Sequence, residues 1–358
     1  MSVPNVPAEY RVYATSLGLQ ACGDSREVLK HLDTESVDLV ITSPPFALLR
    51  QKTYGNKNQN EYVNWLCEFG AAAFPALKES GSFVIDLGGS YERGKPVRSL
   101  YNFRVLLAFC DRLGYRFAED FYWFNPAKLP SPIEWVNRRK MRAKDSVNTI
   151  WWFSKGDWPK ADVARVLSPY SDRMKELLKN PEGFYSPAKR PSGHDISNRF
   201  ADRKNEGAIP SNLLQIPNTD SNSHYLRTLK ALKEERHPAR FPGELPAFFI
   251  KFLTEPGDLV VDVFSGSNTT GIVAESLGRR WLSVEIDRKH AALSAVRFLE
   301  GKDIESIRNA VASIANGRSL ALNPTILPTL NGSSPPAKKA TKSRTNARRL
   351  DDAQPALF

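Results

Sequence analysis

The chain has 358 residues, of which 50 are Lys or Arg and 39 are Asp or Glu, so its formal net charge is +11. Apolar residues make up 41% and charged residues 25%, which excludes a largely disordered chain and is typical of a folded globular protein. Three cysteines, Cys22, Cys67 and Cys110, are too few to hold a chain of this length together, which excludes a disulfide scaffold and fits a reducing cytoplasm.

The positive charge predicts an anionic partner, and nucleic acid is favoured over a membrane because no basic amphipathic helix stands out. Neither an apolar stretch long enough to span a bilayer nor a secretory signal is visible. The end of the chain, 317–358, is predicted to be a disordered basic tail, since its last 28 residues hold six basic and two acidic side chains among Ser, Pro, Ala and Thr. The tail is either a solvated end or an arm that tethers DNA without reading its sequence.

Short apolar runs alternate with helical patterns from residue 11 to residue 153. The expected strands are rich in β-branched and aromatic residues, and the expected helices place apolar residues three or four positions apart. Strands are expected at 37–41, 81–87, 117–124 and 147–153, and helices at 61–78 and 101–113. This alternation predicts an α/β fold, in which a parallel sheet is covered by helices on both faces.

The amino-acid composition changes between residues 154 and 236, where Pro, Asn, Ser and basic residues dominate and the hydrophobic periodicity fades. We interpret this stretch as an inserted, loop-rich module, because irregular polar loops commonly bind partners. The regular alternation returns at residue 237. Strands are expected there at 259–264 and 281–285, a loop entering a helix at 266–277, and a helix at 290–299. The sequence therefore predicts two halves, 1–153 and 237–316, on either side of the module.

The second half contains a pattern that suits a nucleoside. Residues 260–271 read as a strand, a turn with Gly266, and the start of a helix, where backbone N–H groups can approach a ligand. Glu285 ends the next strand, 19 residues after Gly266, where a carboxylate can accept both hydroxyls of a ribose. Taken alone, the loop is equally consistent with a purely structural turn. The lack of a Gly-Lys-Ser/Thr ending disfavours ATP, and the few glycines disfavour a dinucleotide. S-adenosylmethionine fits better, with its carboxylate near the loop N–H groups and hydroxyls.

The first half contains a turn that suits a planar base. Residues 42–46, Thr-Ser-Pro-Pro-Phe, follow a buried strand, so they lie at the carboxyl edge of the sheet. The Ser43 hydroxyl and the Pro44 carbonyl can accept two N–H groups, and Phe46 offers a flat stacking face. Pro44 and Pro45 restrict the backbone and so fix these directions. The plainer interpretation is a proline-rich turn after a strand.

These two motifs together resemble a known family. The Ser-Pro-Pro-Phe turn resembles the amine-methylating motif of DNA amino-methyltransferases, and residues 261–271 resemble their cofactor motif. The catalytic motif comes first and the cofactor motif last, which resembles the permuted β group, and the Ser-Pro-Pro-aromatic form is typical of its cytosine-N4-specific enzymes. Residues 121–126, 133–137 and 147–152 are similar to the PvuII-type modification methyltransferases. Two departures are Asn268, where many relatives have glycine, and the C-terminal tail.

The resemblance implies a Rossmann-like class I methyltransferase sheet with circularly permuted motifs and S-adenosylmethionine as cofactor. It also implies that the inserted module recognises the target. The residues implied in catalysis are Ser43, Pro44, Pro45 and Phe46. The residues implied in cofactor binding are Asp24, Phe241, Asp262, Phe264, Gly266, Ser267, Asn268, Thr269, Thr270, Glu285 and Ile286. A site-specific enzyme of this type protects DNA in a restriction–modification system, with a cognate restriction endonuclease as genetic partner and CAGCTG as the suggested target.

The chemistry on double-stranded DNA follows from the buried position of the target amine. The cytosine must be flipped out of the duplex, and hydrogen bonds from its amine to Ser43 and Pro44 would localise the nitrogen lone pair. Cytosine-C5 chemistry is disfavoured because no cysteine lies in a Pro-Cys motif, and a metal is not expected because the five histidines show no ligand spacing. Adenine-N6 methylation and a catalytically inactive DNA-binding protein stay open as alternatives.

Basic residues near these motifs are predicted to contact phosphates, although a solvated surface is the default for any single charge. The residues predicted to bind DNA are Arg50, Lys52, Arg138, Arg139, Lys140, Arg190, His194 and Arg199. Target specificity is expected from the 154–236 module, and the sequence leaves the oligomeric state open.

Overall fold

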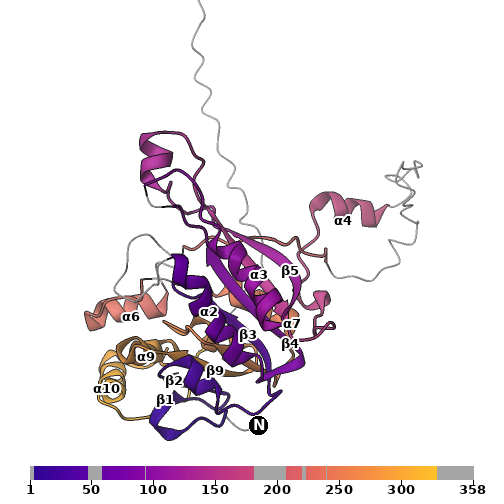
Figure 1. The fold of residues 1–358 in the computed structure, drawn as a ribbon. Helices are drawn as coiled ribbons and strands as arrows, with labels where there is room; N and C mark the ends of the chain where they lie inside the picture. Colours follow the sequence, from indigo (N-terminus) through magenta and orange to yellow (C-terminus); the bar gives the residue numbers. More distant parts are fainter. Residues whose placement is uncertain are drawn as a thin grey trace, which may run out of the picture.

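A computed structural model describes residues 4–46, 59–92, 94–180, 207–219, 223–238 and 240–328. Their strands form one ten-stranded sheet with the order β10-β1-β2-β9-β8-β3-β4-β6-β5-β7. Near its centre, two neighbouring strands from the end of the chain lie between strands from the beginning, as the mixed indigo and orange colours of the sheet show (Figure 1). The sequence pattern of two halves therefore builds a single sheet.

Five parallel strands form the central part of this sheet. They are β2 (Gly18–Cys22), β9 (Arg280–Glu285), β8 (Leu259–Asp262), β3 (Val37–Thr42) and β4 (Leu77–Gly88). Their side chains are largely buried on both faces, which explains the nearly continuous apolar runs in the sequence. Parallel strands end at the same edge of a sheet, so the turns after β3, β8 and β9 lie along one edge.

The sheet is mixed rather than wholly parallel, which corrects the expectation from alternation. β6 (Val147–Ser154) lies between β4 and β5 (Arg116–Phe124) and runs antiparallel to both. The segment between β5 and β6 returns as a long hairpin instead of a helical crossover, and a hairpin connection makes its strands antiparallel. Three short strands complete the sheet: β1 (Arg11–Ala14), β7 (Leu213–Gln215) and β10 (Leu320–Ala321).

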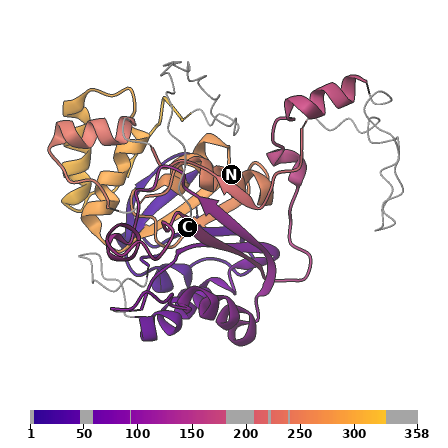
Figure 2. The same ribbon diagram turned by 90° about the horizontal axis from the view of Figure 1, so that it is seen from above.

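Helices cover both faces of the sheet, as predicted, and Figure 2 shows the sheet between a purple group and an orange-to-yellow group. On one face lie α1 (Ser25–Leu29), α2 (Gln59–Ala73) and α3 (Tyr101–Leu113). On the other face lie α6 (His224–Leu232), α7 (Glu244–Leu253), α8 (Thr269–Ser276), α9 (Arg288–Ser294) and α10 (Ile304–Ala315). Alternate residues of the central strands enter the two apolar cores, as the two-residue period of a strand requires.

Shorter elements lie between these. They are the 3₁₀ turns η1 (Ala8–Tyr10), η3 (Val163–Val166) and η5 (Ala295–Phe298), the π-helical turn η2 (Glu134–Arg138) and the helix α4 (Asp172–Lys179). Among the described residues, none of the helices is both long enough and apolar enough to cross a bilayer.

Several predicted boundaries shift for local reasons. The helix predicted to reach residue 78 ends at Ala73, because Pro75 follows and a proline cannot continue the hydrogen-bond ladder. Within 266–277, predicted as a loop entering a helix, the helix begins at Thr269, because Gly266 and Asn268 have left-handed backbones with φ of 49° and 54°.

The predicted module 154–236 and the predicted tail 317–358 both contribute strands to the central sheet. The stretch 154–236 supplies β7, which pairs with β5, and α6, which packs in the core with α10 and η5, whereas 181–206 lies outside the described residues. The tail predicted from residue 317 is wrong for its first residues, since β10 pairs with β1 and Leu322 is buried. The backbone N–H of Leu322 also donates to the Ala14 carbonyl at 2.7 Å, which explains why this segment joins the sheet.

Candidate active site

The two motif-bearing turns leave adjacent strands. Residues 43–46, which we call the catalytic turn, follow β3, and residues 263–268, which we call the cofactor loop, follow β8. β3 and β8 are paired in parallel, with Leu39 opposite Val260 and Val40 opposite Val261. The predicted meeting of two distant stretches along one sheet edge is therefore confirmed.

Asp262, the last residue of β8, joins these two turns. Its Oδ1 accepts hydrogen bonds from the Thr42 hydroxyl at 2.7 Å and the Phe264 backbone N–H at 3.0 Å, and its Oδ2 accepts from the Thr270 hydroxyl at 2.6 Å. Burial raises the pKa of this carboxyl, while the hydrogen bonds favour its charged form. We assign Asp262 a supporting role, because its two oxygens accept three hydrogen bonds from other protein groups.

The catalytic turn places its serine against a buried acid. The Ser43 hydroxyl donates to Oδ2 of Asp86, on β4, at 3.0 Å, and the Asn148 side-chain amide donates to Oδ1 at 3.0 Å. Burial raises the pKa of Asp86 to about 6, although both hydrogen bonds oppose that shift. Since the Ser43 proton points to Asp86, the lone pairs of the Ser43 oxygen remain as acceptors for an amine.

Asp86 and Asn148 were missed by the sequence interpretation. Asp86 lies inside the apolar run predicted as strand 81–87, and Asn148 lies near the start of strand 147–153. The usable signal was a carboxylate near the carboxyl end of a buried parallel strand, where ligands bind. Asn148 gives no such signal, because only the antiparallel pairing of β6 with β4 brings it beside Asp86.

Phe46 packs over the end of β4. A Cβ atom built on Gly88 would lie 2.4 Å from Cε2 of Phe46, so only glycine leaves room for this ring. The Tyr101 hydroxyl donates to the Gly88 carbonyl and helps fix this strand end. The ring is half-buried, while Pro44 is buried and Pro45 is half-buried. The predicted stacking face therefore lies next to the Ser43–Asp86 pair.

The cofactor loop bends toward the end of β9. The Gly266 and Asp287 backbone N–H groups donate to the two carboxylate oxygens of Glu285 at 2.8 Å and 3.0 Å, and burial raises the pKa of that carboxyl. A Cβ on Gly266 would lie 2.9 Å from the His237 ring, so the loop needs glycine there. Ile286, 74% exposed, offers an apolar surface beside the carboxylate. An acceptor with lone pairs left over, next to an apolar surface, fits the ribose and base of an adenosine group.

Asn268 ties the cofactor loop to neighbouring buried groups of the protein. Its fully buried side chain donates to the Tyr13 hydroxyl at 3.0 Å and accepts from Ser283 at 2.7 Å and from the Gly271 N–H at 2.9 Å. Asparagine tolerates the left-handed backbone better than most residues, which explains how it occupies this position. Because its polar atoms are engaged with protein groups, we assign Asn268 a supporting role.

Arg297 is a further support that the sequence interpretation missed. Its Nε donates to the Ser267 carbonyl at 2.6 Å, and its terminal nitrogen donates to the Ser267 hydroxyl at 3.1 Å. Its guanidinium lies 4.5 Å from the centre of the Tyr225 ring, in α6. The Ser267 hydroxyl also lies 3.4 Å from that of Thr269. The start of α8 is thus held by a cation that stacks on another part of the chain.

The remaining predicted cofactor residues surround this loop. Asp24 is the N-cap of α1 and pairs with Arg26, and their hydrogen bonds lower the pKa of the Asp24 carboxyl. The adjacent Gly23 N–H donates to the Glu285 carbonyl at 3.0 Å, which brings Asp24 to the same edge. The Phe264 ring lies 4.5 Å from that of Phe69, and Phe241 is half-buried against the core.

Comparison with known proteins identifies the family. The family model of the DNA methylases matches residues 37–296, well over half of the chain. The chain belongs to the DNA methylase family. This DNA methylase is 56% identical to the type II methyltransferase M.PvuII of Proteus hauseri over 312 residues, which cover 87% of this chain and 93% of that protein.

More distant relatives and a solved structure agree. The DNA methylase is 26% identical to the type II methyltransferase M.BglII of Bacillus subtilis over 286 residues, covering 79% of this chain and 69% of that protein. Its structure is similar to that of the PvuII DNA methyltransferase (cytosine-N4-specific), with a TM-score of 0.73 and 48% sequence identity. That match covers 88% of this chain and 99% of the other. The predicted family and the predicted methyltransferase sheet are confirmed.

Some basic residues predicted to bind DNA lie in the hairpin between β5 and β6. Arg138 and Arg139 are exposed and share the carboxylate of Glu134, and Lys140 is exposed beside them. Arg50, Lys52, Arg190, His194 and Arg199 lie outside the described residues. Contact with DNA stays a prediction for all of them.

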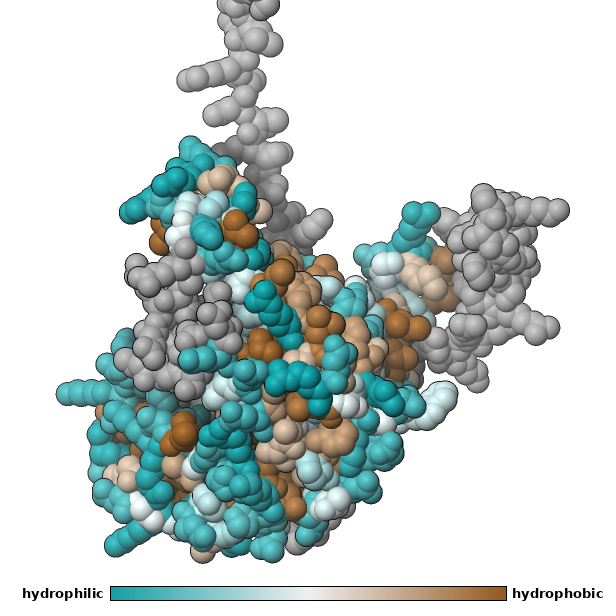
Figure 3. Space-filling model, viewed as in Figure 1, coloured by the Kyte–Doolittle hydropathy of each residue, from teal (hydrophilic) through white to brown (hydrophobic). Residues whose placement is uncertain are grey.

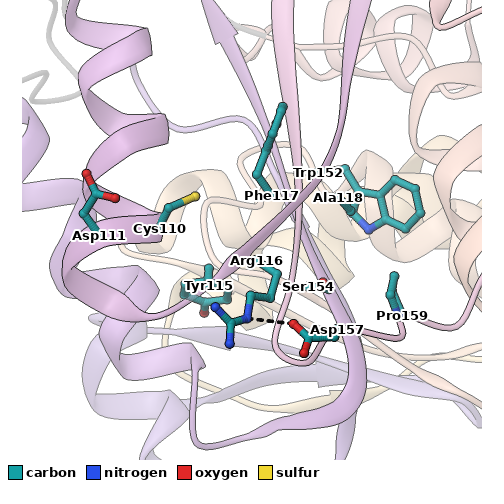
Figure 4. Close-up of a pocket in the computed structure, with 10 residues that line it drawn as sticks. All are labelled: Cys110, Asp111, Tyr115, Arg116, Phe117, Ala118, Trp152, Ser154, Asp157 and Pro159. Carbon is teal, nitrogen blue, oxygen red and sulfur yellow. Dashed lines mark ion pairs between the residues drawn. The ribbon is translucent and has the colours of Figure 1, made fainter.

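A cavity of about 670 Å³ lies elsewhere in the DNA methylase, between the start of β5 and the end of β6 (Figure 4). Arg116 and Asp157 form an ion pair of 2.9 Å in its lining, and Arg116 lies opposite Ser154 in the sheet. The hairpin joins the other ends of these strands, so the cavity is at the opposite edge from the catalytic turn. Within the described residues, no three His, Cys, Asp or Glu side chains are grouped to hold a metal ion.

Proposed function

We propose that this DNA methylase transfers a methyl group from S-adenosylmethionine to the exocyclic N4 of cytosine in double-stranded DNA. The observation that carries the proposal is the Ser43 hydroxyl, which donates to buried Asp86 and faces the edge shared with the cofactor loop. The 56% identity to a type II methyltransferase and the fold shared with a cytosine-N4-specific enzyme support it. We further propose CAGCTG as the target and protection of host DNA in a restriction–modification system as the role.

The residues around the cofactor loop fit S-adenosylmethionine, which supplies an electrophilic methyl group when bound. The Glu285 carboxylate would accept hydrogen bonds from the ribose hydroxyls, since each of its oxygens uses only one lone pair on the protein. Ile286 would pack against the adenine. The N-terminal end of α8, held in place by Arg297, favours the negative carboxylate of the amino-acid portion.

The residues of the catalytic turn activate the amine. Its N–H groups donate to the Ser43 oxygen and the Pro44 carbonyl, so electron density stays on the nitrogen instead of spreading into the ring. With a pKa of about 6, Asp86 is mostly a carboxylate at pH 7 and keeps the Ser43 proton turned away from the amine. Asp86 can also take up, through Ser43, the proton that the methylated amine releases. Phe46 stacks on the flipped base and offsets part of its lost stacking.

Product analysis tests this proposal. Plasmid DNA methylated by the protein is hydrolysed to nucleosides, and mass spectrometry is expected to find N4-methylcytosine at CAGCTG sites. Finding N6-methyladenine would instead support the adenine-N6 alternative. A protein that binds DNA without any methylation, and does not bind S-adenosylmethionine by calorimetry, would be the catalytically inactive alternative.

The remaining assignments complete the proposal. We place target recognition in the module 154–236 and the two halves of the methyltransferase domain at 1–153 and 237–316. A cognate restriction endonuclease is the expected genetic partner, and the cytoplasm is the expected location. The segment beyond residue 328 is proposed to bind DNA phosphates without reading sequence.

A further inference from the structure

The hairpin of residues 125–146, between β5 and β6, rises from the active edge of the sheet. In Figure 1 it extends above the ends of the strands. Its base is fixed by the pairing of Phe124 with Val147, and the next residue, Asn148, donates to Asp86. The hairpin therefore begins directly beside the Ser43–Asp86 pair.

Three large apolar side chains on this hairpin are exposed, and Leu129 and Ile133 are more exposed than Met141. Leu129 is 81% exposed and Ile133 is 61% exposed. A single exposed leucine is ordinary, but these two lie four positions apart on a segment with six basic and only two acidic residues. Figure 3 shows apolar atoms among hydrophilic ones on this projection at the upper left. The hairpin thus carries exposed apolar side chains on a segment whose charged residues are mainly basic.

The hairpin is braced by its own polar groups. The Lys144 ammonium donates to the carbonyls of Pro126 and Lys128, both at 3.2 Å, and the Asp145 N–H donates to the Ser131 carbonyl at 2.9 Å. Arg98 reaches from outside the hairpin to bind Asp145 through two hydrogen bonds of 2.9 Å and 3.0 Å. The exposed side chains are therefore presented on a preorganised support, which reduces the ordering cost of binding.

We propose that Leu129 and Ile133 form an apolar wedge that enters the base stack of DNA and fills the space left by the flipped cytosine. This inference rests on the proposed function. Removing a base from the stack exposes apolar faces of its neighbours, and side chains such as Leu and Ile can cover them. Cations around the wedge, Arg138 and Lys140 among them, match the charge of the flanking phosphates.

The test compares Leu129→Ala/Ile133→Ala with Leu107→Ala, a control on α3 that removes a 57% exposed leucine away from the hairpin. On a normal CAGCTG duplex the double variant is expected to lower kcat/KM about tenfold or more, while the control stays within about twofold. On a duplex whose target cytosine lies opposite an abasic site, the loss is expected to shrink to about twofold, because the base is already unpaired.

The smaller loss on the abasic duplex distinguishes a role in base flipping from a general structural defect of the variant. An equal loss on both duplexes, or no loss on the normal duplex, would overturn the wedge while leaving the methyltransferase assignment intact. Leu129→Met keeps an apolar side chain and is expected to retain activity. A loss as large as that of Leu129→Ala/Ile133→Ala would contradict the role.

The wedge can also be tested if the wild type transfers no methyl group, a result that would count against the proposed function. The probe is then 2-aminopurine at the target position, whose fluorescence rises when the base leaves the stack. The double variant is expected to show a smaller rise than the wild type, and an equal rise would overturn the wedge.

Discussion

Two turns leave adjacent strands at the active edge, and they use their polar side chains differently. In the cofactor loop and the turn of α8 after it, the side chains of Asn268 and Thr270 are buried and bonded to other protein groups. In the catalytic turn, Ser43 and Phe46 are only half-buried, and Ser43 keeps free acceptor capacity. The comparison teaches that the cofactor loop presents mainly its backbone, whereas the catalytic turn presents side chains as well as the Pro44 carbonyl. Substitutions in the catalytic turn should therefore lower mainly turnover, whereas substitutions of the buried polar groups around the cofactor loop should lower mainly the free energy of unfolding.

The largest effect is expected at the catalytic turn. Ser43→Ala removes the acceptor for the amine and should lower kcat about 100-fold, with the affinity for S-adenosylmethionine nearly unchanged. Single-turnover kinetics and calorimetry measure the two quantities. Ser43→Thr keeps a hydroxyl and serves as the matched control. An equal loss of turnover and cofactor affinity would reject a role toward the base.

The pH dependence of Asp86 sharpens the comparison. Its native pKa of about 6 exceeds the unfolded value of about 4, so the native state binds the proton more tightly. Stability from this group is fully present below about pH 4 and is lost as the pH rises to about 6, by about 3 kcal/mol in all. Urea titrations should show that Asp86→Asn lacks this component. Turnover of the wild type should fall below about pH 6, because protonated Asp86 can no longer take up the amine proton through Ser43.

That prediction has a clear control. Asp262 and Glu285 also have raised pKa values, so the wild type and Asp86→Asn must be compared at each pH. Parallel stability curves for the two proteins between pH 4 and 6 would show that Asp86 is not the titrating group.

The link between the turns is expected to be mainly structural. Asp262→Ala removes three hydrogen bonds to a buried carboxylate and should lower the free energy of unfolding by about 3 kcal/mol or more. Urea unfolding measures this change, and Asp262→Asn, which keeps one acceptor oxygen, should lose less. A large loss of cofactor affinity at unchanged stability would point instead to direct contact with the cofactor.

A smaller effect is expected at Arg297, on the cofactor side. Arg297→Met keeps the length of the side chain but removes both hydrogen bonds to Ser267, and it should raise KM for S-adenosylmethionine about tenfold. Steady-state kinetics at saturating DNA measure it, with kcat expected to change little. Arg308→Met, at an exposed arginine of α10, is the control. A fall in kcat alone would place Arg297 on the catalytic side.

The smallest effect is expected from the end of the chain. Truncation after Pro328 leaves β10 and its pairing with β1 intact and removes six basic residues. DNA binding at low salt should weaken about tenfold or less, with a shallower salt dependence and the same methylated sequence. Gel-shift titrations at several salt concentrations measure it. A changed target sequence would contradict the tethering role.

Much of the site could be predicted from local patterns. The apolar runs before 42–46 and 263–268 fixed these turns at the carboxyl edge, and Glu285 followed at the spacing that a βαβ unit requires. The position of Asp86 near the end of a buried strand was a usable signal, but its partners could not be assigned, because Ser43 and Asn148 are 43 and 62 positions away along the chain. The same holds for Arg297, whose contact with Tyr225 depends on how α6 packs.

The sequence by itself determined the family, the strand–helix alternation and the two motif-bearing turns, because those depend on neighbouring residues and regular periodicity. Only the tertiary structure decided which polar groups support the site and which face a ligand. It placed β6 beside β4 and turned the Ser43 proton toward Asp86. It also engaged the carboxylate of Asp262 in hydrogen bonds with Thr42 and Thr270, so that this carboxylate links the two turns. The physical reason is that hydrogen bonds between strands depend on strand order and direction, which local composition does not encode.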